Sequence, residues 1–475
     1  MWMRDTNDAT NCGSGVMEWW LYSEQEDIQD EMPVLAVVMI YVALIAVCLF
    51  IQALVWPENK PVTFEFFIPS VLLPACVLTT ILFFVKMVLS ATVCYAEIRK
   101  YIAKSWEVEL KTYARKNIAL AAWTALTPLE QPALNMLKLE GEFPLAPKTP
   151  LRIEIEDLFE QTRNEQIFTK LLTPIAMMLN GNNYRGIEII VWVRGGDNFC
   201  VDALRRVLEH LNIPNANACE IEYLTECPEY GMVDKWIAAP DDNVINRIVI
   251  TVDMHEEDSD SKSMESACAF LFTNHYVRGA GEKPVYLYQP MSGVTDVEEK
   301  MPVYLEVKSV TAPKTLWYTG LSRVDKYPLL QALDAKNLAS ERLDMEASLG
   351  EKSAGYRWLA LALAADAVRY AQGEQLVATS ENNKFAITSL SSKKTNLPDK
   401  AKWGHTIPPV VHSVIVSGGL MISWLFYNVS FTPKPEHIST LWIVASIVIP
   451  AIIAFGAGLS LTVLAVNKAY QHMGY

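Results

Sequence analysis

The sequence predicts a membrane α-helical protein with four spans, two near each end, and one cytoplasmic α/β domain between the two pairs. Three observations support this fold class: four long apolar stretches, basic residues that flank the middle region, and short apolar runs that alternate with helical patterns inside it. The 475 residues leave room for four spans and one large domain. The chain therefore divides into two transmembrane hairpins and a domain that is tethered at both ends.

The four apolar stretches differ in length and charge. Val34 to Trp56 carries no charge, and Phe66 to Ser90 carries one, Lys86, close enough to its end to reach the headgroups. Val410 to Tyr427 is shorter, and Leu441 to Val466 is uncharged. A helix crosses a hydrocarbon core of about 30 Å with about 20 apolar residues, so we expect four spans arranged two and two.

The basic residues give the expected topology. Each loop inside a hairpin has a single lysine, whereas basic residues collect on the domain side of both hairpins. They are Arg99, Lys100, Lys104, Lys111, Arg115 and Lys116 after the first hairpin, and Lys393, Lys394, Lys400 and Lys402 before the second. Positive residues stay on the cytoplasmic side, so we expect the large domain and both termini to be cytoplasmic.

The expected organisation follows from these boundaries. It comprises an acidic N-terminal tail (1–32), a first transmembrane hairpin (33–91), a connecting helix and proline-rich loop (92–150), an α/β domain (151–391), a linker (392–408), a second hairpin (409–466) and a C-terminal tail (467–475). In the N-terminal tail, residues 17–22 (MEWWLY) form either a short interfacial helix or a tail that packs on the domain or stays loose.

The spans lack the features of a conduit. They contain no Asp, Glu or Arg, and His412 lies near the cytoplasmic end of the third span, where a wetted helix end is a simpler reading than a proton relay. Ala454 and Gly458, four residues apart, allow close helix approach. Asn428 opens a glycosylation sequon, but chance explains so short a motif better. The protein does not resemble a transporter.

In the middle region, helical spacing continues from Glu97 to Trp123, and prolines from Pro128 to Pro150 indicate an extended loop. Helices and strands then alternate, which predicts an α/β domain. The expected elements are helices Asp157 to Asn180, Val201 to Leu211 and Ala354 to Ala371, and strands Ile187 to Val193, Arg247 to Val252, Ala267 to Phe272, Gln375 to Thr379 and Phe385 to Leu390. The closing helix–strand–strand unit repeats the earlier strand pair, which suggests two related halves.

Three segments carry a resemblance to a known superfamily. The run 264–272 (MESACAFLF) after the strand IVITVD, the turn 349–355 (LGEKSAG) before LALALAADAV, and the closing strands LVATS and FAITSL resemble the thiolase and β-ketoacyl synthase superfamily. The similarity covers about half of residues 151–391. It implies a two-halved α/β fold and, by likeness to degenerate thiolase-like proteins of type VI secretion clusters, an adaptor or accessory role at a bacterial inner membrane.

The residues depart from the superfamily's catalytic pattern. Its enzymes use a cysteine on a strand-to-helix elbow and two partners such as histidines. Cys200 precedes a helix, but it comes too early relative to Glu265 and lacks the superfamily's motif, while Cys268 falls inside a buried strand. His255 and His275 lack the flanking glycines of catalytic histidines. We therefore expect no thiolase-type chemistry and assign no catalytic residue.

Two other segments were weighed as binding sites. The acidic run 255–260 offers carboxylates for a hard cation but lacks the spacing and glycine of a calcium loop. The turn 194–198 (RGGDN) is either an anion cradle at a helix start or a plain strand-to-helix turn. Phosphate-loop, dinucleotide and nucleophile-elbow motifs are absent, and the sequence assigns no cofactor and no metal.

The net charge and the cysteines indicate which classes of partner the protein binds. A net charge of −14 argues against nucleic acid, which needs a basic surface. The eight cysteines form no paired motif with metal spacing and are typical of free thiols in a reducing compartment. The expected partners are a lipid bilayer and a protein, such as a secreted effector.

Three functions follow as hypotheses: a non-enzymatic adaptor whose domain binds an effector, a membrane immunity protein that neutralises a toxin, and a membrane-tethered acyl-transfer enzyme. The first is favoured, because the residues depart from the catalytic pattern and the spans lack a conduit's charges.

Overall fold

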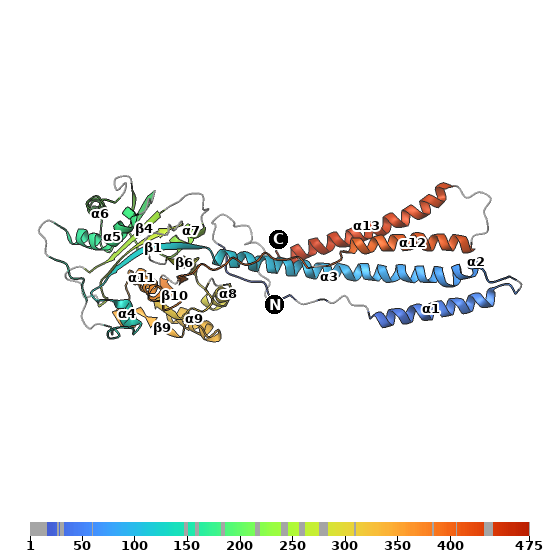
Figure 1. Ribbon diagram of the computed structural model, residues 1–475, viewed down its shortest axis with the longest axis horizontal. Helices are drawn as coiled ribbons and strands as arrows, with labels where there is room; N and C mark the ends of the chain where they lie inside the picture. Colours follow the sequence, from blue (N-terminus) through green and yellow to red (C-terminus); the bar gives the residue numbers. More distant parts are fainter. Residues whose placement is uncertain are drawn as a thin grey trace. The chain divides into compact units, whose positions relative to one another are not determined.

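The computed structural model describes residues 17–25, 28, 33–58, 60–146, 151–156, 161–181, 186–213, 219–238, 246–255, 262–274, 284–307, 310–381, 384–404, 406–431 and 440–474. They fall into two compact units. The helical unit contains the described residues within Tyr22–Trp106 and Lys400–Tyr475, and the α/β unit those within Cys12–Leu21 and Glu107–Asp399. Figure 1 labels the elements of both units.

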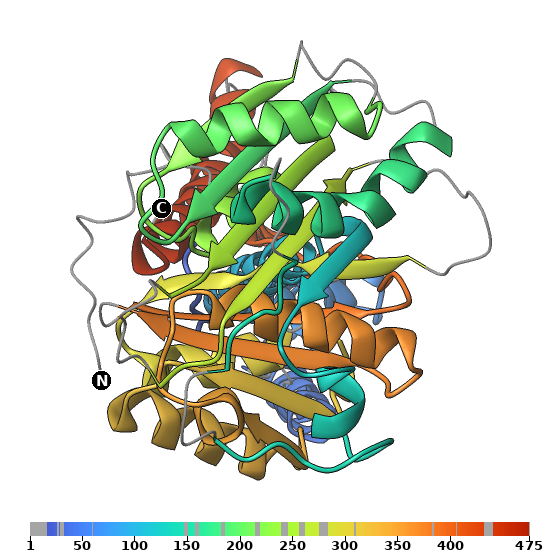
Figure 2. The ribbon, with the colours of Figure 1, turned by 90° about the vertical axis from the view of Figure 1, so that its left-hand side faces the viewer.

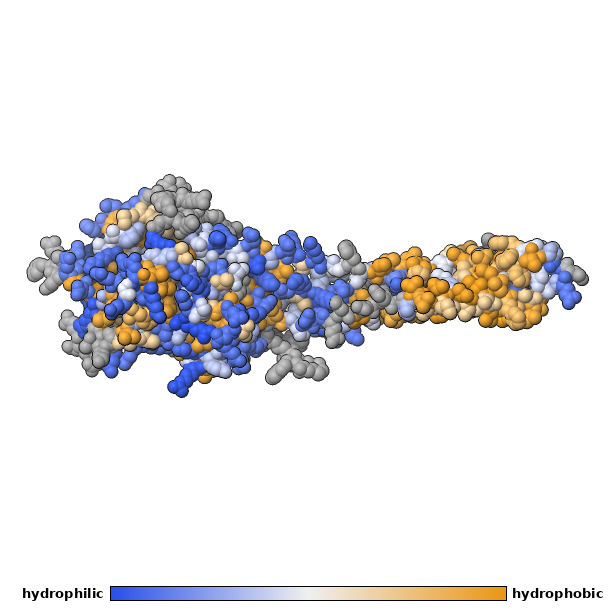
Figure 3. Space-filling model, turned by 60° about the horizontal axis from the view of Figure 1, so that its bottom comes forward, coloured by the Kyte–Doolittle hydropathy of each residue, from blue (hydrophilic) through white to orange (hydrophobic). Residues whose placement is uncertain are grey.

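The helical unit contains the four long apolar helices that the sequence predicts. Its elements are α1 (Val34–Val55), α2 (Phe64–Phe67), a π-helical turn η1 (Ile68–Leu72), α3 (Leu73–Ala114), α12 (Pro409–Phe431) and α13 (Thr440–His472). Four helices, which begin at Val34, Phe64, Pro409 and Val444, are long and apolar enough to cross a membrane. Figure 3 shows apolar side chains over the surface of this unit. The topology that we read from the flanking charges stays a prediction.

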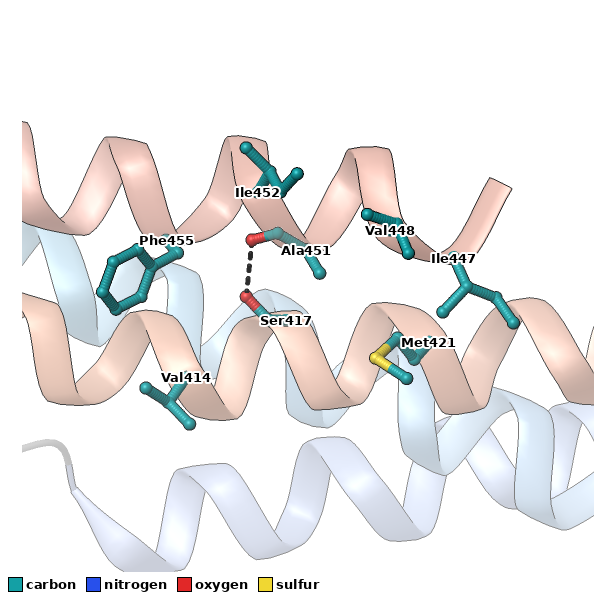
Figure 4. A pocket seen from close by; sticks show the side chains of 8 residues that line it. All are labelled: Val414, Ser417, Met421, Ile447, Val448, Ala451, Ile452 and Phe455. Carbon is teal, nitrogen blue, oxygen red and sulfur yellow. Dashed lines mark hydrogen bonds between the residues drawn. The ribbon is translucent and has the colours of Figure 1, made fainter. Parts of the chain in front are cut away.

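Helices α12 and α13 pack closely through small side chains. Ser417 Oγ donates a hydrogen bond to the Ala451 carbonyl at 3.1 Å, and a Cβ on Gly458 would overlap Ser413. An apolar groove of about 400 Å³ runs between the two helices and exposes Met421 and Phe455 (Figure 4). Glycine at position 458 is thus explained by close helix approach.

The α/β unit is built on one mixed sheet of eleven strands, in the order β3-β2-β4-β5-β1-β6-β11-β10-β8-β9, with β7 paired to β11. Its strands are β1 (Asn117–Leu126), β2 (Ile187–Val193), β3 (Glu220–Leu224), β4 (Asn246–Asp253), β5 (Ser266–Thr273), β6 (Val285–Tyr288), β7 (Met291–Val294), β8 (Thr315–Thr319), β9 (Glu341–Asp344), β10 (Gln375–Glu381) and β11 (Lys384–Ser391). Its helices are α4 (Pro132–Met136), α5 (Arg163–Gly181), α6 (Phe199–His210), α7 (Gly231–Ala238), α8 (Val297–Val307), α9 (Arg323–Ala335), α10 (Met345–Leu349) and α11 (Tyr356–Arg369).

The sheet consists of two halves with the same topology. The first half has the order β3-β2-β4-β5-β1 and the second β9-β8-β10-β11-β6. In each half the first three strands are parallel and the last two pairings are antiparallel. Antiparallel pairing of β1 with β6 joins the halves. The strand pairing therefore confirms an α/β domain with two related halves.

Helices cover both faces of the sheet. The α5 and α6 helices lie on the first half (Figure 2), and α5 contacts β1 and β5. Phe168, Leu171 and Leu204 are fully buried in this layer. The α11 helix is buried except at Asp366 and Arg369, which explains why its sequence is a nearly continuous run of leucine and alanine.

The predicted connecting helix from Glu97 to Trp123 is wrong beyond Ala114, where α3 ends. Residues 117–126 instead form β1, which pairs with β5 on one side and β6 on the other. An apolar run of ten residues suits a helix or a buried strand, and only the partner strands decide between them. The proline-rich stretch also contains a short helix, α4, rather than loop alone.

The N-terminal segment 17–22 is not helical. Trp19 is buried, and its ring lies 6.0 Å from that of Tyr113 and 5.3 Å from that of Tyr304. Of the two readings of this segment, the structure favours packing on the domain.

Candidate functional site

The carboxyl ends of β2 and β4 form the natural place for a site in this sheet. These neighbouring strands are parallel, and the chain leaves β2 through α6 to reach β3 on the far side of β2. Ligands of open α/β sheets bind where connections diverge in this way. The side chains that follow the two strands, Arg194 and Asp253, therefore define the candidate site.

Arg194 and Asp253 form an ion pair that reaches into the start of α11. Arg194 Nε lies 2.8 Å from Asp253 Oδ1, and the guanidinium also donates to Ser353 Oγ at 2.8 Å. The other carboxylate oxygen of Asp253 accepts hydrogen bonds from Ser353 Oγ and, at 2.7 Å, from the Gly355 backbone N–H. Asp253 is 1% exposed and the Arg194 side chain 36%, so the pair has a buried anion and a cation that reaches solvent.

Glu265 forms a second buried anion beside the first. Its carboxylate accepts from the backbone N–H groups of Ile153 at 2.8 Å and His255 at 2.9 Å, and Arg163 pairs with it at 2.8 Å. The Glu265 side chain is fully buried, whereas that of Arg163 is 35% exposed. The carboxylate thus ties together the segment before α5, the start of α5 and the chain after β4.

His255 uses both ring nitrogens within the cluster. Its Nε2 lies 2.9 Å from the Ser263 carbonyl oxygen and its Nδ1 lies 3.3 Å from an Arg194 guanidinium nitrogen. A carbonyl oxygen only accepts and a guanidinium only donates, so Nε2 carries the proton and Nδ1 accepts. Both ring nitrogens are thus engaged by neighbouring groups of the cluster.

The second half carries a matching cluster at the ends of β8 and β10. Glu346 accepts from Thr319 Oγ1 at 2.7 Å and from the Gly320 N–H at 2.6 Å, and Asp325 accepts from Ser380 Oγ at 2.8 Å. Lys352 Nζ donates to the Ser380 carbonyl at 3.3 Å. Residues 346–355, here called the closing segment, therefore contact the strand ends of both halves.

Glycines let the closing segment pack without space for a side chain. Gly350 has φ = +108°, and a Cβ there would collide with the Lys262 carbonyl oxygen. A Cβ on Gly355 would lie 2.6 Å from the Asp253 side chain. The segment is therefore packed directly onto the candidate site, and the ion pairs beneath it bind one part of the domain to another.

Cys200 and Cys268, the two cysteines compared with the superfamily's nucleophile, have no base as a hydrogen-bond partner among the described residues, and the same holds for Cys227. Cys200 is 3% exposed, and Asn164 Nδ2 contacts its sulfur at 3.5 Å. Burial raises the pKa of Cys268, which lies within β5. Cys227 donates to the Ala354 carbonyl at 3.4 Å, and burial raises the pKa of its thiol to about 12. In the described part of the structure, the ring hydrogen bonds of His255 go to Ser263 and Arg194 rather than to one of these thiols.

The turn 194–198 supports the plain strand-to-helix reading. The Gly196 N–H donates to the Val193 carbonyl at 3.1 Å, and the Asp197 carboxylate accepts from the Phe199 N–H at 3.0 Å. A carboxylate of the chain itself thus occupies the place that an anion would take at this helix start.

The other predicted residues lie elsewhere. His275 and Glu256 to Asp260 fall outside the described residues, so the cation question at the acidic run stays open. His412 is buried in α12 with its ring 6.2 Å from that of Phe83, and Asn428 Nδ2 donates to the Trp424 carbonyl at 2.9 Å. Within the described ranges, no three His, Cys, Asp or Glu side chains are grouped to hold a metal ion.

The sequence analysis did not assign roles to Arg163, Asp253 or Ser263. A signal was present for Asp253, since a carboxylate directly after a buried parallel strand lies at the ligand-binding edge of a sheet. The sequence holds no such signal for Arg163 and Ser263, because they belong to segments that tertiary packing brings to the cluster.

No protein-family model matches this chain, and no curated protein sequence does. Similar solved structures include AbyA1, a tetronic acid condensing enzyme, at 10% identity and a TM-score of 0.37, covering 57% of this chain and 99% of that one. They also include acetamide-bound OleA from Xanthomonas campestris, at 10% identity, a TM-score of 0.36 and coverage of 58% and 98%. A third is 3-oxoacyl-acyl-carrier-protein synthase III from Aquifex aeolicus, at 10% identity, a TM-score of 0.32 and coverage of 58% and 99%. At these values the likeness carries no argument, and the two-halved architecture rests on the strand pairing.

Proposed function

We propose that this chain is a membrane-anchored, non-enzymatic binding protein whose α/β unit holds a protein partner on the cytoplasmic side of a bacterial inner membrane. The observation that carries the proposal is the occupation of the strand-end site by the chain's own ion pairs. Arg194 and Asp253 form an ion pair, and Ser353 of the closing segment is hydrogen-bonded to both. A site that is filled in this way serves to fix the domain's structure and leaves its outer surface for binding.

The thiols support the same proposal. Acyl transfer through a cysteine needs a thiolate and a base within hydrogen-bond reach. His255 instead donates to a carbonyl and accepts from Arg194, and the pKa of Cys227 is raised to about 12. Neither group is arranged for proton transfer to or from a substrate.

The apolar helices support the anchoring role. Four helices have the length and composition of membrane spans, and the basic residues that flank them favour a cytoplasmic domain. By the resemblance of its sequence to degenerate thiolase-like proteins, the partner that we propose is a secreted effector of a type VI-like system. Membrane immunity and tethered acyl transfer are the competing functions.

Crosslinking of the full chain in native membranes tests the proposal. After purification, mass spectrometry identifies the partner and the crosslinked residues. The adaptor function predicts an effector joined to the α/β unit, between residues 107 and 399, with capture unchanged by Cys200→Ala and His255→Ala. Crosslinks confined to the short loops inside the two hairpins would favour immunity instead. Turnover of an acyl thioester that Cys200→Ala abolishes would establish the enzyme.

A further inference from the structure

The pocket that holds Trp19 is the feature that we develop further. The Trp19 side chain is 5% exposed, while its neighbours Met17, Trp20 and Leu21 are only half-buried. One fully buried aromatic side chain with partly exposed neighbours is typical of an anchored peptide, in which a single residue supplies most of the binding energy.

The segment reaches this pocket from outside the body of the domain. Residues 22–106 separate it in sequence from the rest of the α/β unit, and it belongs to neither a helix nor a strand of the sheet. Its contacts include the rings of Tyr113 and Tyr304, a backbone hydrogen bond between Met17 and the Tyr113 hydroxyl, and packing of Met17 and Leu21 on the same hydrophobic cluster. The segment thus binds as an extended peptide does, by a central buried anchor, flanking apolar side chains and its backbone.

The walls of the pocket are held by hydrogen bonds that do not involve the segment. The Tyr113 hydroxyl donates to Asp234 Oδ1 at 2.8 Å and accepts from Gln289 Nε2 at 2.9 Å. The hydroxyl of Tyr304 is hydrogen-bonded to Ser389. These bonds therefore hold both rings from within the domain, independently of Trp19.

We propose that this pocket is a peptide-binding site for an extended segment with a tryptophan anchor, and that residues 17–21 occupy it as an internal ligand. The occupant that displaces them is a partner segment of the same chemistry, a tryptophan flanked by apolar residues. That the displacing segment comes from a partner protein rests on the proposed function. The internal segment then competes with the partner segment and lowers its apparent affinity for the pocket.

The loss of apparent affinity that this competition causes can be calculated. A tethered ligand acts at an effective concentration on the order of 1 mM. If a free peptide with the sequence of residues 17–25 binds the empty pocket with a Kd of about 10 μM, competition weakens its binding to the wild-type chain on the order of a hundredfold.

The experiment titrates a fluorescent peptide with the sequence 17–25 against the full chain in lipid nanodiscs. The Trp19→Ala chain, whose pocket is vacated, is expected to bind the peptide about a hundredfold more tightly than the wild-type chain does. The Trp20→Ala chain, changed at the half-buried neighbour, is expected to behave like wild type. A peptide that carries the Trp19→Ala change is expected to bind none of the chains.

Equal affinity of the wild-type and Trp19→Ala chains for the peptide would overturn the proposal, and so would the absence of binding to a folded Trp19→Ala chain. If Trp19→Ala and Trp19→Phe both fail to fold, Trp19 is an ordinary core residue and the proposal also fails. The titration needs no partner, whereas the crosslinking experiment uses the wild-type chain. Each proposal can therefore fail without the other.

Discussion

Glu265→Ala removes the buried carboxylate that joins three segments of the candidate site. The two backbone N–H groups that it accepts, from Ile153 and His255, then lie in the interior without a partner. Arg163 also loses its ion pair, but its side chain is 35% exposed and can be hydrated. The two backbone groups therefore dominate the effect.

The magnitude follows from the number of orphaned groups. An unsatisfied buried donor costs about 1–3 kcal/mol, so two cost about 2–6 kcal/mol, with a central value of about 4 kcal/mol. For a domain of this size that loss lowers Tm by roughly 10 °C. Lys336→Ala is the matched control, because its pair with Glu306 lies on the surface, with side chains 49% and 51% exposed. An exposed pair contributes less than about 1 kcal/mol.

Thermal unfolding of the full chain in nanodiscs, followed by near-ultraviolet circular dichroism, measures the difference between the two variants. Hydrogen exchange adds a local readout, since the amides of Ile153 and His255 are expected to exchange faster in Glu265→Ala. If the two variants unfold within about 2 °C of each other and these amides keep their protection, the hydrogen bonds do not have the role that we assign to them.

Three further predictions concern other residues of the α/β unit. Burial raises the pKa of the Cys227 thiol to about 12, so little of it is thiolate at pH 8. We expect alkylation of Cys227 to be about a thousandfold slower in the native than in the unfolded chain, as measured by mass spectrometry of timed samples. Equal alkylation rates would refute this prediction. Burial raises the pKa of Asp366 from 3.8 to about 6, so the folded state binds its proton more tightly and the free energy of unfolding falls as pH rises from about 4 to 7, by at most about 3 kcal/mol. Asp366→Asn keeps an oxygen for the Trp123 indole N–H, which donates to Asp366 at 2.8 Å, and should remove this slope in denaturant titrations; an unchanged slope would assign it to another group. Gly350→Ala is expected to lower Tm by several degrees more than Gly373→Ala, because both glycines have positive φ but only the Cβ at position 350 meets backbone; similar values would contradict the close packing of the closing segment.

Long-range contacts explain where the sequence analysis was incomplete at the site. The run 264–272 was singled out, and Glu265 lies within it, yet its partners Arg163 and Ile153 come from segments about a hundred residues earlier. Likewise, the ring contacts of His255 with Arg194 and Ser263 cannot be read from the sequence around it. Hydrogen-bond partners of this kind have no local signature in the sequence.

The sequence by itself determined the four apolar helices and the buried strands β2, β4, β5, β10 and β11. A helix that is apolar all round needs a long apolar run and a buried strand a short, largely apolar one, so length separates these two cases. A run of intermediate length, such as 117–126, needs its partner strands to decide. Tertiary structure alone decided that residues 117–126 form β1, that Trp19 enters the domain and that the strand-end site is filled by ion pairs. Each of these depends on groups that lie far apart in the chain and meet only in the folded domain.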